Sequence, residues 1–388
     1  MKETTINKWH IFLVMFFFSL IVRIQIPIFT PYAAAFGATS IFVGIILSAT
    51  SLSNLSGNLI AGPLVDRISK KAFITLPLFV SGWLFIAHGL ASDSYDLLIL
   101  HALNGFTLGF LFPAAFTLLS SYANNSRQQG KNIAINGLLS TIASIIAPLI
   151  GGKMVALIGY ENTYFFIGAA MILTGIYSIP FLRERNQIVT VKTRIQGAYH
   201  SQRALSSTNL SIIYLIGFAV MYIHGVIIFE IPYLTIEKGL STFNTGQLFS
   251  YMGIGTFISL SLFFVNRFDP IKRLMIGLFG MSMILFMLLN SSLPLSLLLL
   301  LIGLFFGLIM PAMATGITDN TPSEMHGRAF GYMSAVYSLG IISSSFITGA
   351  VRDIISPYFI AFLVGMLVVT FVGFFKLRSP KTFIPYKV

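Results

Sequence analysis

One ten-residue pattern occurs twice in the chain, and each copy lies inside a long apolar run. The pattern reads Gly-x-x-x-Gly-x-x-x-Pro-Ala, and its copies begin at Gly105 and Gly303, at an offset of 198 residues. The apolar setting identifies it as a duplicated membrane segment. A membrane chain built from two related halves can open alternately to either side around a site between them. The repeat therefore predicts that the chain carries a solute across a membrane.

Twelve apolar runs occupy most of the chain, and each is close to the roughly 20 residues that a membrane-spanning helix needs. Charged residues make up 9% of the sequence, against about 25% in soluble domains. The runs are too long and too evenly apolar for barrel strands, and backbone groups find no water partner in lipid. We therefore expect an all-α membrane protein with twelve transmembrane helices. The runs are about 9–31, 41–64, 72–91, 97–120, 132–156, 161–182, 209–234, 243–265, 272–290, 295–318, 329–350 and 357–377.

The longest polar segment, 183–208, divides the runs six and six. We expect two pseudo-symmetric six-helix bundles, 1–182 and 209–388, joined by a cytoplasmic linker at 183–208. Prolines in equivalent runs bend helices, and glycines let helices approach closely. The expected hinge and packing residues are Pro27, Gly105, Gly109 and Pro113 in the first half and Pro232, Gly303, Gly307 and Pro311 in the second.

The net charge of +12 could indicate nucleic acid, but its distribution along the chain indicates membrane topology. With a cytoplasmic N-terminus, 20 of the 24 Lys and Arg residues fall on the inner side, three (Lys153, Lys238 and Arg352) fall outside, and Arg23 lies within the membrane. This bias follows the positive-inside rule. We expect a multi-pass protein of a prokaryotic cell membrane with both termini in the cytoplasm, and no nucleic-acid partner. No cysteine is present and no spacing makes a metal site, so neither metal nor cofactor is expected.

The loop between the second and third runs reads Gly62-Pro-Leu-Val-Asp66-Arg67-Ile-Ser69-Lys70-Lys71. It resembles the hallmark loop of the major facilitator superfamily, with Ser69 in place of the second glycine. Gly62 permits tight packing at a helix end, and Asp66 can sit against the positive N-terminal end of a neighbouring helix. Such a charge cluster can latch one conformation and release the other. We expect Gly62, Asp66, Arg67, Lys70 and Lys71 to form a conformational gating loop.

Two further motifs resemble that superfamily. In the fourth run, His101 and Asn104 stand where the family usually has arginine and glutamine, and the arginine is associated with proton movement in proton-coupled members. Histidine titrates near neutral pH, so His101 could act in proton coupling or simply pack between helices. In the fifth run, Pro148, Gly151 and Gly152 resemble the antiporter motif, which favours export over uptake. The glycine pair would allow close contact across the two halves.

Arg23 and Glu230 are the strongly ionisable residues that lie well within the runs, in the equivalent first and seventh. Burying either at mid-bilayer costs roughly 2.5–3.5 kcal/mol on insertion scales, so each should face a cavity or a partner. In the resembled superfamily these runs line the central cavity. We expect a polar cluster in the outer half, with Arg23 close to Glu230 when the outer side is closed. The candidate substrate and proton-coupling residues are Arg23, Gln25, His101, Asn104, Glu230 and His224.

The resemblance implies a secondary transporter and not an enzyme. We expect a proton-coupled exporter of a small amphipathic organic compound, working as a monomer, in which Glu230 accepts an external proton and releases Arg23. A zwitterion, an anion or a neutral amphipath suits such a cavity better than a purely cationic drug. The alternatives are a proton-coupled importer of a small metabolite and a non-transporting solute sensor on the same fold.

Overall fold

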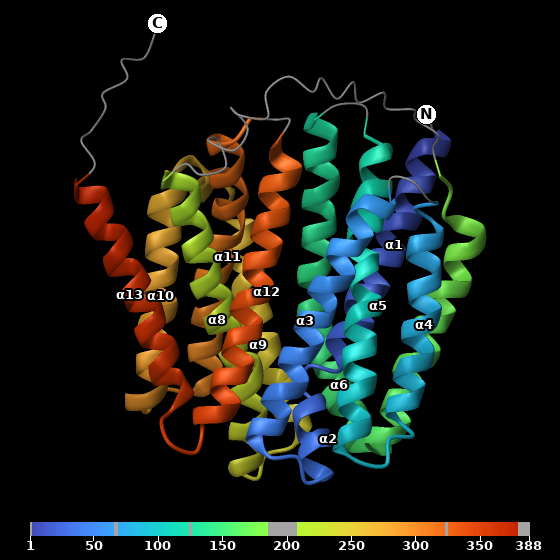
Figure 1. The fold of residues 1–388 in the computed structure, drawn as a ribbon, viewed down its shortest axis with the longest axis horizontal. Helices are drawn as coiled ribbons and strands as arrows, with labels where there is room; N and C mark the ends of the chain where they lie inside the picture. Colours follow the sequence, from blue (N-terminus) through green and yellow to red (C-terminus); the bar gives the residue numbers. More distant parts are fainter. Residues whose placement is uncertain (1, 66–68, 124–125, 185–207, 323–324, 379–388) are drawn as a thin grey trace, which may run out of the picture.

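The computed structural model describes residues 2–65, 69–123, 126–184, 208–322 and 325–378, and within them every regular element is a helix. The first half contains α1 (Lys2–Ile24), α2 (Phe29–Ala35), α3 (Ser40–Val65), α4 (Ala72–His88), α5 (Ser94–Ser121) and α6 (Ser126–Phe181). The second contains α8 (Thr208–Glu237), α9 (Thr242–Ser261), the 3-10 helix η1 (Phe263–Arg267), α10 (Pro270–Asn290), α11 (Leu295–Asn320), α12 (His326–Val351) and α13 (Pro357–Arg378). The long helices lie side by side, with the start of α1 and the end of α13 at one end of the bundle and α2 at the other (Figure 1).

Within the described ranges, nine helices are long and apolar enough to cross a membrane. One of them contains Gly159, whose φ of 79° and ψ of 175° break the helix, so that α6 consists of two arms. A positive φ is readily adopted by glycine, which lacks a Cβ. Three further segments could also span a membrane but are not counted among the nine. They are the second arm of α6, the 17-residue α4, and α9. This all-helical arrangement agrees with the predicted fold class and is consistent with twelve spans.

The predicted prolines act differently in the two halves. Pro27 follows the end of α1, so the first apolar run is a helix broken before α2, whereas Pro232 lies inside the continuous α8. Pro113 and Pro311 lie inside α5 and α11. In each of these two helices a threonine hydroxyl donates to the proline carbonyl oxygen. The distance is 2.7 Å from Thr117 Oγ1 to the Pro113 oxygen and 3.0 Å from Thr315 Oγ1 to the Pro311 oxygen.

The repeated glycines lie where helices of the same half cross. A Cβ added to Gly105 of α5 would meet the backbone oxygen of Thr50 in α3, and one added to Gly303 of α11 would meet that of Met252 in α9. Gly109 and Gly307 repeat these contacts one turn further along. The duplicated sequence therefore builds the same close helix pair twice.

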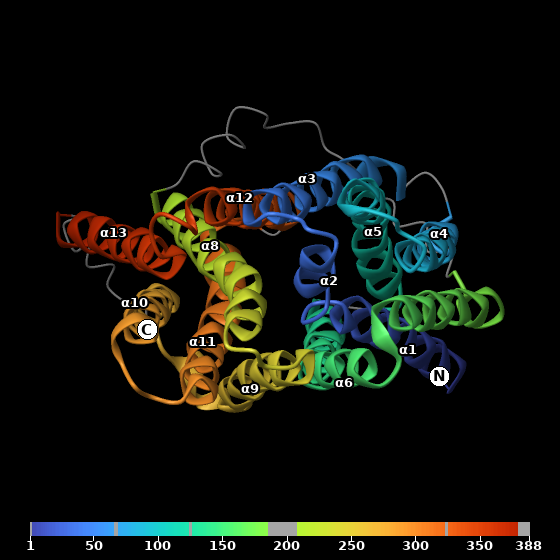
Figure 2. The ribbon, with the colours of Figure 1, turned by 90° about the horizontal axis from the view of Figure 1, so that it is seen from below.

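The buried apolar side chains form two clusters. One spans residues 11–182 and also takes in Phe229 and Tyr233, while the other spans residues 210–372. Seen from the α2 end, the two halves meet along two helix pairs, α3 with α12 and α6 with α9 (Figure 2). Each half thus has its own core, although the boundaries at 182 and 209 stay a prediction and the linker lies mostly outside the described residues.

The two helix pairs that join the halves are related by the repeat. Ser48 of α3 donates to the backbone oxygen of Ile342 in α12 at 3.0 Å, and Ser250 of α9 donates to that of Ile145 in α6 at 2.6 Å. Donor and acceptor occupy equivalent positions in both cases, at offsets of 202 and 197 residues. The junction between the halves therefore has approximate two-fold symmetry.

Candidate functional site

A network of charged side chains lies at the α2 end, which the charge distribution predicts to be the outer end. Arg352 follows α12, and its Nε donates to Glu230 Oε1 of α8 at 3.0 Å. A second guanidinium nitrogen bonds Glu237, and a third lies 3.9 Å from Asp353. The guanidinium also covers the Tyr233 ring at 4.4 Å, a cation–π contact. We call this set, Glu230, Tyr233, Glu237, Arg352 and Asp353, the outer network.

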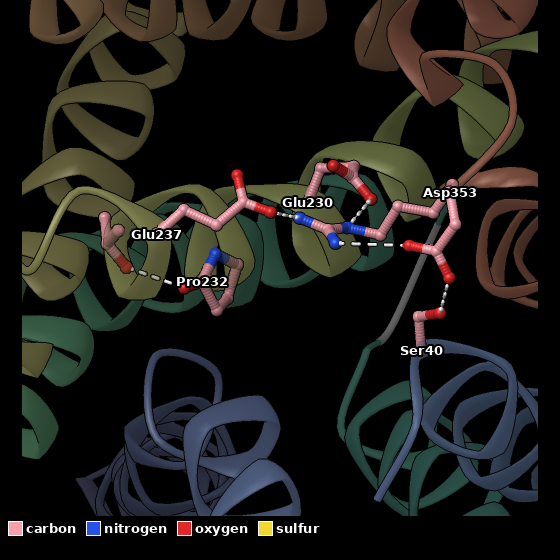
Figure 3. Close-up of polar contacts among 7 residues, drawn as sticks. Ser40, Glu230, Pro232, Glu237 and Asp353 are labelled. Carbon is pink, nitrogen blue, oxygen red and sulfur yellow. Dashed lines mark hydrogen bonds and ion pairs between the residues drawn. The ribbon is translucent and has the colours of Figure 1, made fainter.

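The outer network also reaches the other half of the molecule. Ser40, at the start of α3, donates to Asp353 Oδ2 at 3.2 Å, as Figure 3 shows. The chain of contacts therefore runs from Glu230 through Arg352 and its neighbour Asp353 to the first half. Because Ser40 and Asp353 come from opposite halves, this exposed contact links the two halves at the predicted outer end, beside the close packing of Gly44 on Gly349.

Burial and charge act in opposite directions on Arg352. Burial lowers its pKa, but the hydrogen bond to Glu237 and the charges of Glu230 and Glu237 outweigh that effect, and the pKa lies above its ordinary value. The guanidinium accordingly stays protonated, and any change of charge in the outer network must occur on its carboxyl groups. Glu230 is the buried one among them: its side chain is 6% exposed, whereas that of Glu237 is 55% exposed.

A cavity of about 540 Å³ adjoins the outer network. Its wall includes Glu230, Glu237 and Arg352, together with residues of the α10–α11 and α12–α13 connections such as Ser291 and Ser356. These connections belong to the predicted outer end. Glu230 therefore lies at the wall of a cavity on that side while Ser40 and Asp353 are in contact.

Arg23 lies in a second cavity, of about 150 Å³, between the two halves. From the first half it is lined by Arg23, Ile26, Thr141, Ser144 and Pro148, and from the second by His224, Ile228, Phe249, Met252, Gly253, Thr256 and Phe306. We call it the central cavity. Arg23 donates to Ser140 Oγ at 3.3 Å, and the His224 ring stacks on Phe306 with ring centres 4.9 Å apart.

The expected approach of Arg23 to Glu230 is wrong for this conformation. Although Ser40 and Asp353 close the predicted outer end, Glu230 binds Arg352, and Arg23 binds Ser140. The reason is helical geometry. His224 faces the central cavity, and Glu230 follows it by six residues, about 600° of rotation, so it lies on another face of α8.

The remaining candidates lie away from the central cavity. His88 Nε2 and His101 Nδ1 are 3.0 Å apart, His88 Nδ1 lies 2.7 Å from the Leu84 oxygen, and Phe29 stacks on His101. Both rings are satisfied when neutral, with His88 donating to Leu84 and His101 to His88. Asn104 accepts from Ser81 at 2.6 Å, inside the first half. These contacts favour a packing role for His101 and Asn104.

Gln25 Oε1 is buried without a partner within the described part of the chain.

The predicted gating loop is only partly described, because Asp66 and Arg67 lie outside the described residues. Gly62 lies in the last turn of α3. Glu184, after the end of α6, accepts from Ser69 Oγ at 2.5 Å and from Lys71 N at 2.6 Å. Ser69 Oγ in turn accepts from Ala72 N at 3.1 Å. The serine that replaces the family glycine therefore accepts a hydrogen bond from the first residue of α4. Among the described residues, Glu184 is the carboxylate observed at this positive helix end.

The residues of the predicted antiporter motif lie where α6 crosses the second half. A Cβ on Gly152 would meet the backbone oxygen of Thr242 in α9, and Thr242 Oγ1 donates to the Gly152 oxygen at 3.3 Å. A Cβ on Gly246 of α9 would meet the oxygen of Pro148. Gly151 instead packs on Ile24 of α1. The glycine pair thus lets α6 pack closely on α1 of its own half and on α9 of the other half.

The sequence reasoning missed Arg352, Glu237 and Glu184 as partners. A signal for the outer network was present, because Glu230 and Glu237 are seven residues apart, about two helical turns, and so share one face of α8. Two carboxylates on one face near a helix end require a cation from another helix. Arg352 was among the three cations predicted to lie on that side.

Comparison with known proteins agrees with this architecture. Residues 11–345 match the family model of the Major Facilitator Superfamily. An MFS-type transporter of Methanocaldococcus jannaschii is 24% identical over 90% of this chain and 92% of its own. Multidrug resistance protein MdtG of Enterobacter lignolyticus is 26% identical over 95% of this chain and 90% of its own.

Solved structures show the same fold. A bacterial homolog of the human lysosomal transporter Spinster, in an inward-facing and occupied conformation, superposes with a TM-score of 0.77. It is 14% identical, and the match covers 96% of this chain and 97% of the other. The chain therefore belongs to the Major Facilitator Superfamily: it is a multi-pass membrane transporter of small molecules and not an enzyme.

Proposed function

We propose that this transporter is a proton-coupled exporter of small amphipathic organic compounds, and that it works as a monomer by alternating access in a cytoplasmic membrane. Both termini lie on the cytoplasmic side in this proposal. The observation that carries it is the position of Glu230, a buried carboxylate that binds Arg352 and lines a cavity at the predicted outer end. The MdtG relatives, named for multidrug resistance, support the direction of transport.

Proton uptake at Glu230 would act on the contact between the halves. A neutral carboxyl group loses the Coulomb attraction to Arg352 and keeps only a weaker hydrogen bond. Arg352 is then held mainly by the exposed Glu237, and exposed ion pairs contribute little, typically below about 1 kcal/mol. Asp353, next in the chain, can separate from Ser40, and the predicted outer end opens. An external proton thereby favours the state that releases cargo outside. The antiport cycle is completed when the outer end closes again and Glu230 releases this proton toward the cytoplasm.

The two sites are coupled through α8. Glu230 belongs to the outer network and His224 to the central cavity, six residues and about 9 Å apart along the helix axis. A shift of α8 on opening therefore changes both. Coupling then requires only that proton and cargo bind the two conformations with different affinities.

The test compares Glu230→Gln with Glu237→Gln in proteoliposomes that carry a pH gradient. The probes are a panel of anionic, neutral and cationic aromatic amphipaths. We expect Glu230→Gln to abolish uptake driven by the gradient while exchange of labelled for unlabelled probe persists. Glu237→Gln is the matched control, because it removes one carboxylate from the exposed side of the network. Its probe uptake should still be driven by the pH gradient.

Gradient-driven uptake in Glu230→Gln equal to that of the wild type would refute the role of this residue. Failure of every probe to move in wild-type vesicles under a gradient would refute proton-coupled export of amphipaths.

A further inference from the structure

We infer that the central cavity binds the acidic head group of an organic anion, so that the cargo is an amphipathic carboxylate rather than a cationic drug. This inference rests on the proposed transport function and names the substrate class for it. It is carried by an arginine that has no acidic partner among the described residues, a histidine in the same lining, and a described lining that contains no carboxylate.

Arg23 has no acidic partner in the described structure. Its one hydrogen bond there goes to Ser140 Oγ at 3.3 Å, although a guanidinium carries five N–H donors. No Asp or Glu is present among the described residues that line the central cavity. A cation held inside a membrane protein normally pairs with an anion, because an uncompensated charge there is costly. The missing anion is supplied when a cargo carboxylate binds.

His224 adds a second polar group to the lining of the same cavity. Its Nδ1 atom is buried and has no hydrogen-bond partner in the described part of the chain, and its ring stacks on Phe306. A neutral imidazole carries one N–H donor, which can bind a carboxylate oxygen that enters the cavity. Arg23 and His224 come from α1 and α8, so one anion bound by both would bridge the two halves.

The lining of the central cavity combines one cationic group with polar and apolar side chains from both halves. The first half contributes Arg23, Thr141 and Ser144, while the second half contributes His224 and Thr256 beside the apolar Ile228, Phe249, Met252 and Phe306. Ile228 is the repeat equivalent of Arg23, at the offset of 205 residues that relates Pro27 to Pro232. Equivalent positions thus supply a cation from one half and an aliphatic group from the other.

This lining disfavours cargo that carries a positive charge. A cationic drug would bring a second positive charge beside Arg23, with no carboxylate among the described lining residues to neutralise it. A zwitterion could pair its carboxylate with Arg23, but its ammonium group would find no carboxylate in the same lining. The volume of about 150 Å³ lies below that of typical drug-sized pockets and suits an acidic head group with a short apolar part.

The test measures binding to the full-length purified protein in detergent. The probes share one naphthyl body and differ in the head group: naphthylacetate, naphthylethanol and naphthylethylamine. The proteins are the wild type, Arg23→Met, Arg23→Lys and Arg267→Met, the last a matched arginine loss at an exposed position away from the cavity. Thermal stabilisation and equilibrium binding are the readouts.

We expect naphthylacetate to bind more tightly than the other two probes in the wild type and in Arg267→Met. Its affinity should fall about tenfold to a hundredfold in Arg23→Met, as expected for a lost charge-assisted hydrogen bond, and less in Arg23→Lys. Equal or tighter binding of the alcohol or the amine, no binding of the carboxylate, or unchanged affinity in Arg23→Met would each overturn the inference. Carboxylate binding without gradient-driven transport would instead count against the proposed proton coupling alone.

Discussion

Arg23 and Arg352 carry the same side chain near the junction of the two halves, but their surroundings are opposite. Arg352 lies among Glu230, Glu237 and Asp353, whereas Arg23 has a single hydroxyl partner within the described residues. A paired arginine holds a structure together, while an unpaired one destabilises it until a ligand arrives. In the proposals above, this contrast separates an arginine that helps to keep the outer end closed from an arginine that binds the cargo.

The largest expected effect comes from removing the paired arginine. Arg352→Met leaves the buried Glu230 without its counter-charge, and we expect a loss of about 3 kcal/mol in the free energy of unfolding, at the lower end for broken buried pairs because Arg352 is 15% exposed. Chemical denaturation in mixed micelles measures it. The double variant Arg352→Met with Glu230→Gln should recover part of the loss. An unchanged stability in Arg352→Met would break the comparison.

A change of the opposite sign is expected at the unpaired arginine. Arg23→Met removes an uncompensated charge, so the free energy of unfolding should rise by about 1–2 kcal/mol, less than the full insertion cost because the cavity admits water. The same denaturation experiment compares it with Arg352→Met. A destabilisation of similar size in both variants would show that Arg23 also has a structural partner.

The smallest effects are expected at the symmetric serines, which provide a reference for the two unequal arginines. Ser48→Ala and Ser250→Ala each remove one hydroxyl bond between the halves, and such bonds contribute about 0.6 kcal/mol on average in membrane proteins. We expect nearly equal losses, because the two bonds are related by the repeat. Losses that differ by more than about 1 kcal/mol would show that the junction is not energetically symmetric.

The fold was largely predictable because its signals are local. Apolar runs specify helices, and the repeated glycines at 105 and 303 indicated close helix packing, which the structure shows between α3 and α5 and between α9 and α11. Partners across helices were harder to predict. Glu230 was recognised as a buried charge, but a choice between Arg23 and Arg352 depends on helix rotation, which apolar periodicity leaves undetermined in helices that are apolar on all sides.

The sequence therefore identified some residues of the candidate site but not how their side chains are arranged. Arg23 and His224 do share one cavity, as grouped from the sequence, whereas His101 and Asn104 turn into the first half. Short motifs gave the positions of Gly152 and Lys71, but Glu184, which lies more than 100 residues from its partner Lys71, had no sequence signal.

The outer network has no counterpart in the other half. The repeat places Gln25 opposite Glu230, and Val155 opposite Arg352 at the offset that relates Gly152 to Gly349. The duplicated scaffold is thus shared, while the buried ion pair of Glu230 with Arg352 is present on one copy only. Substitutions in the outer network can therefore alter this pair without changing the serine and glycine contacts that join the two halves.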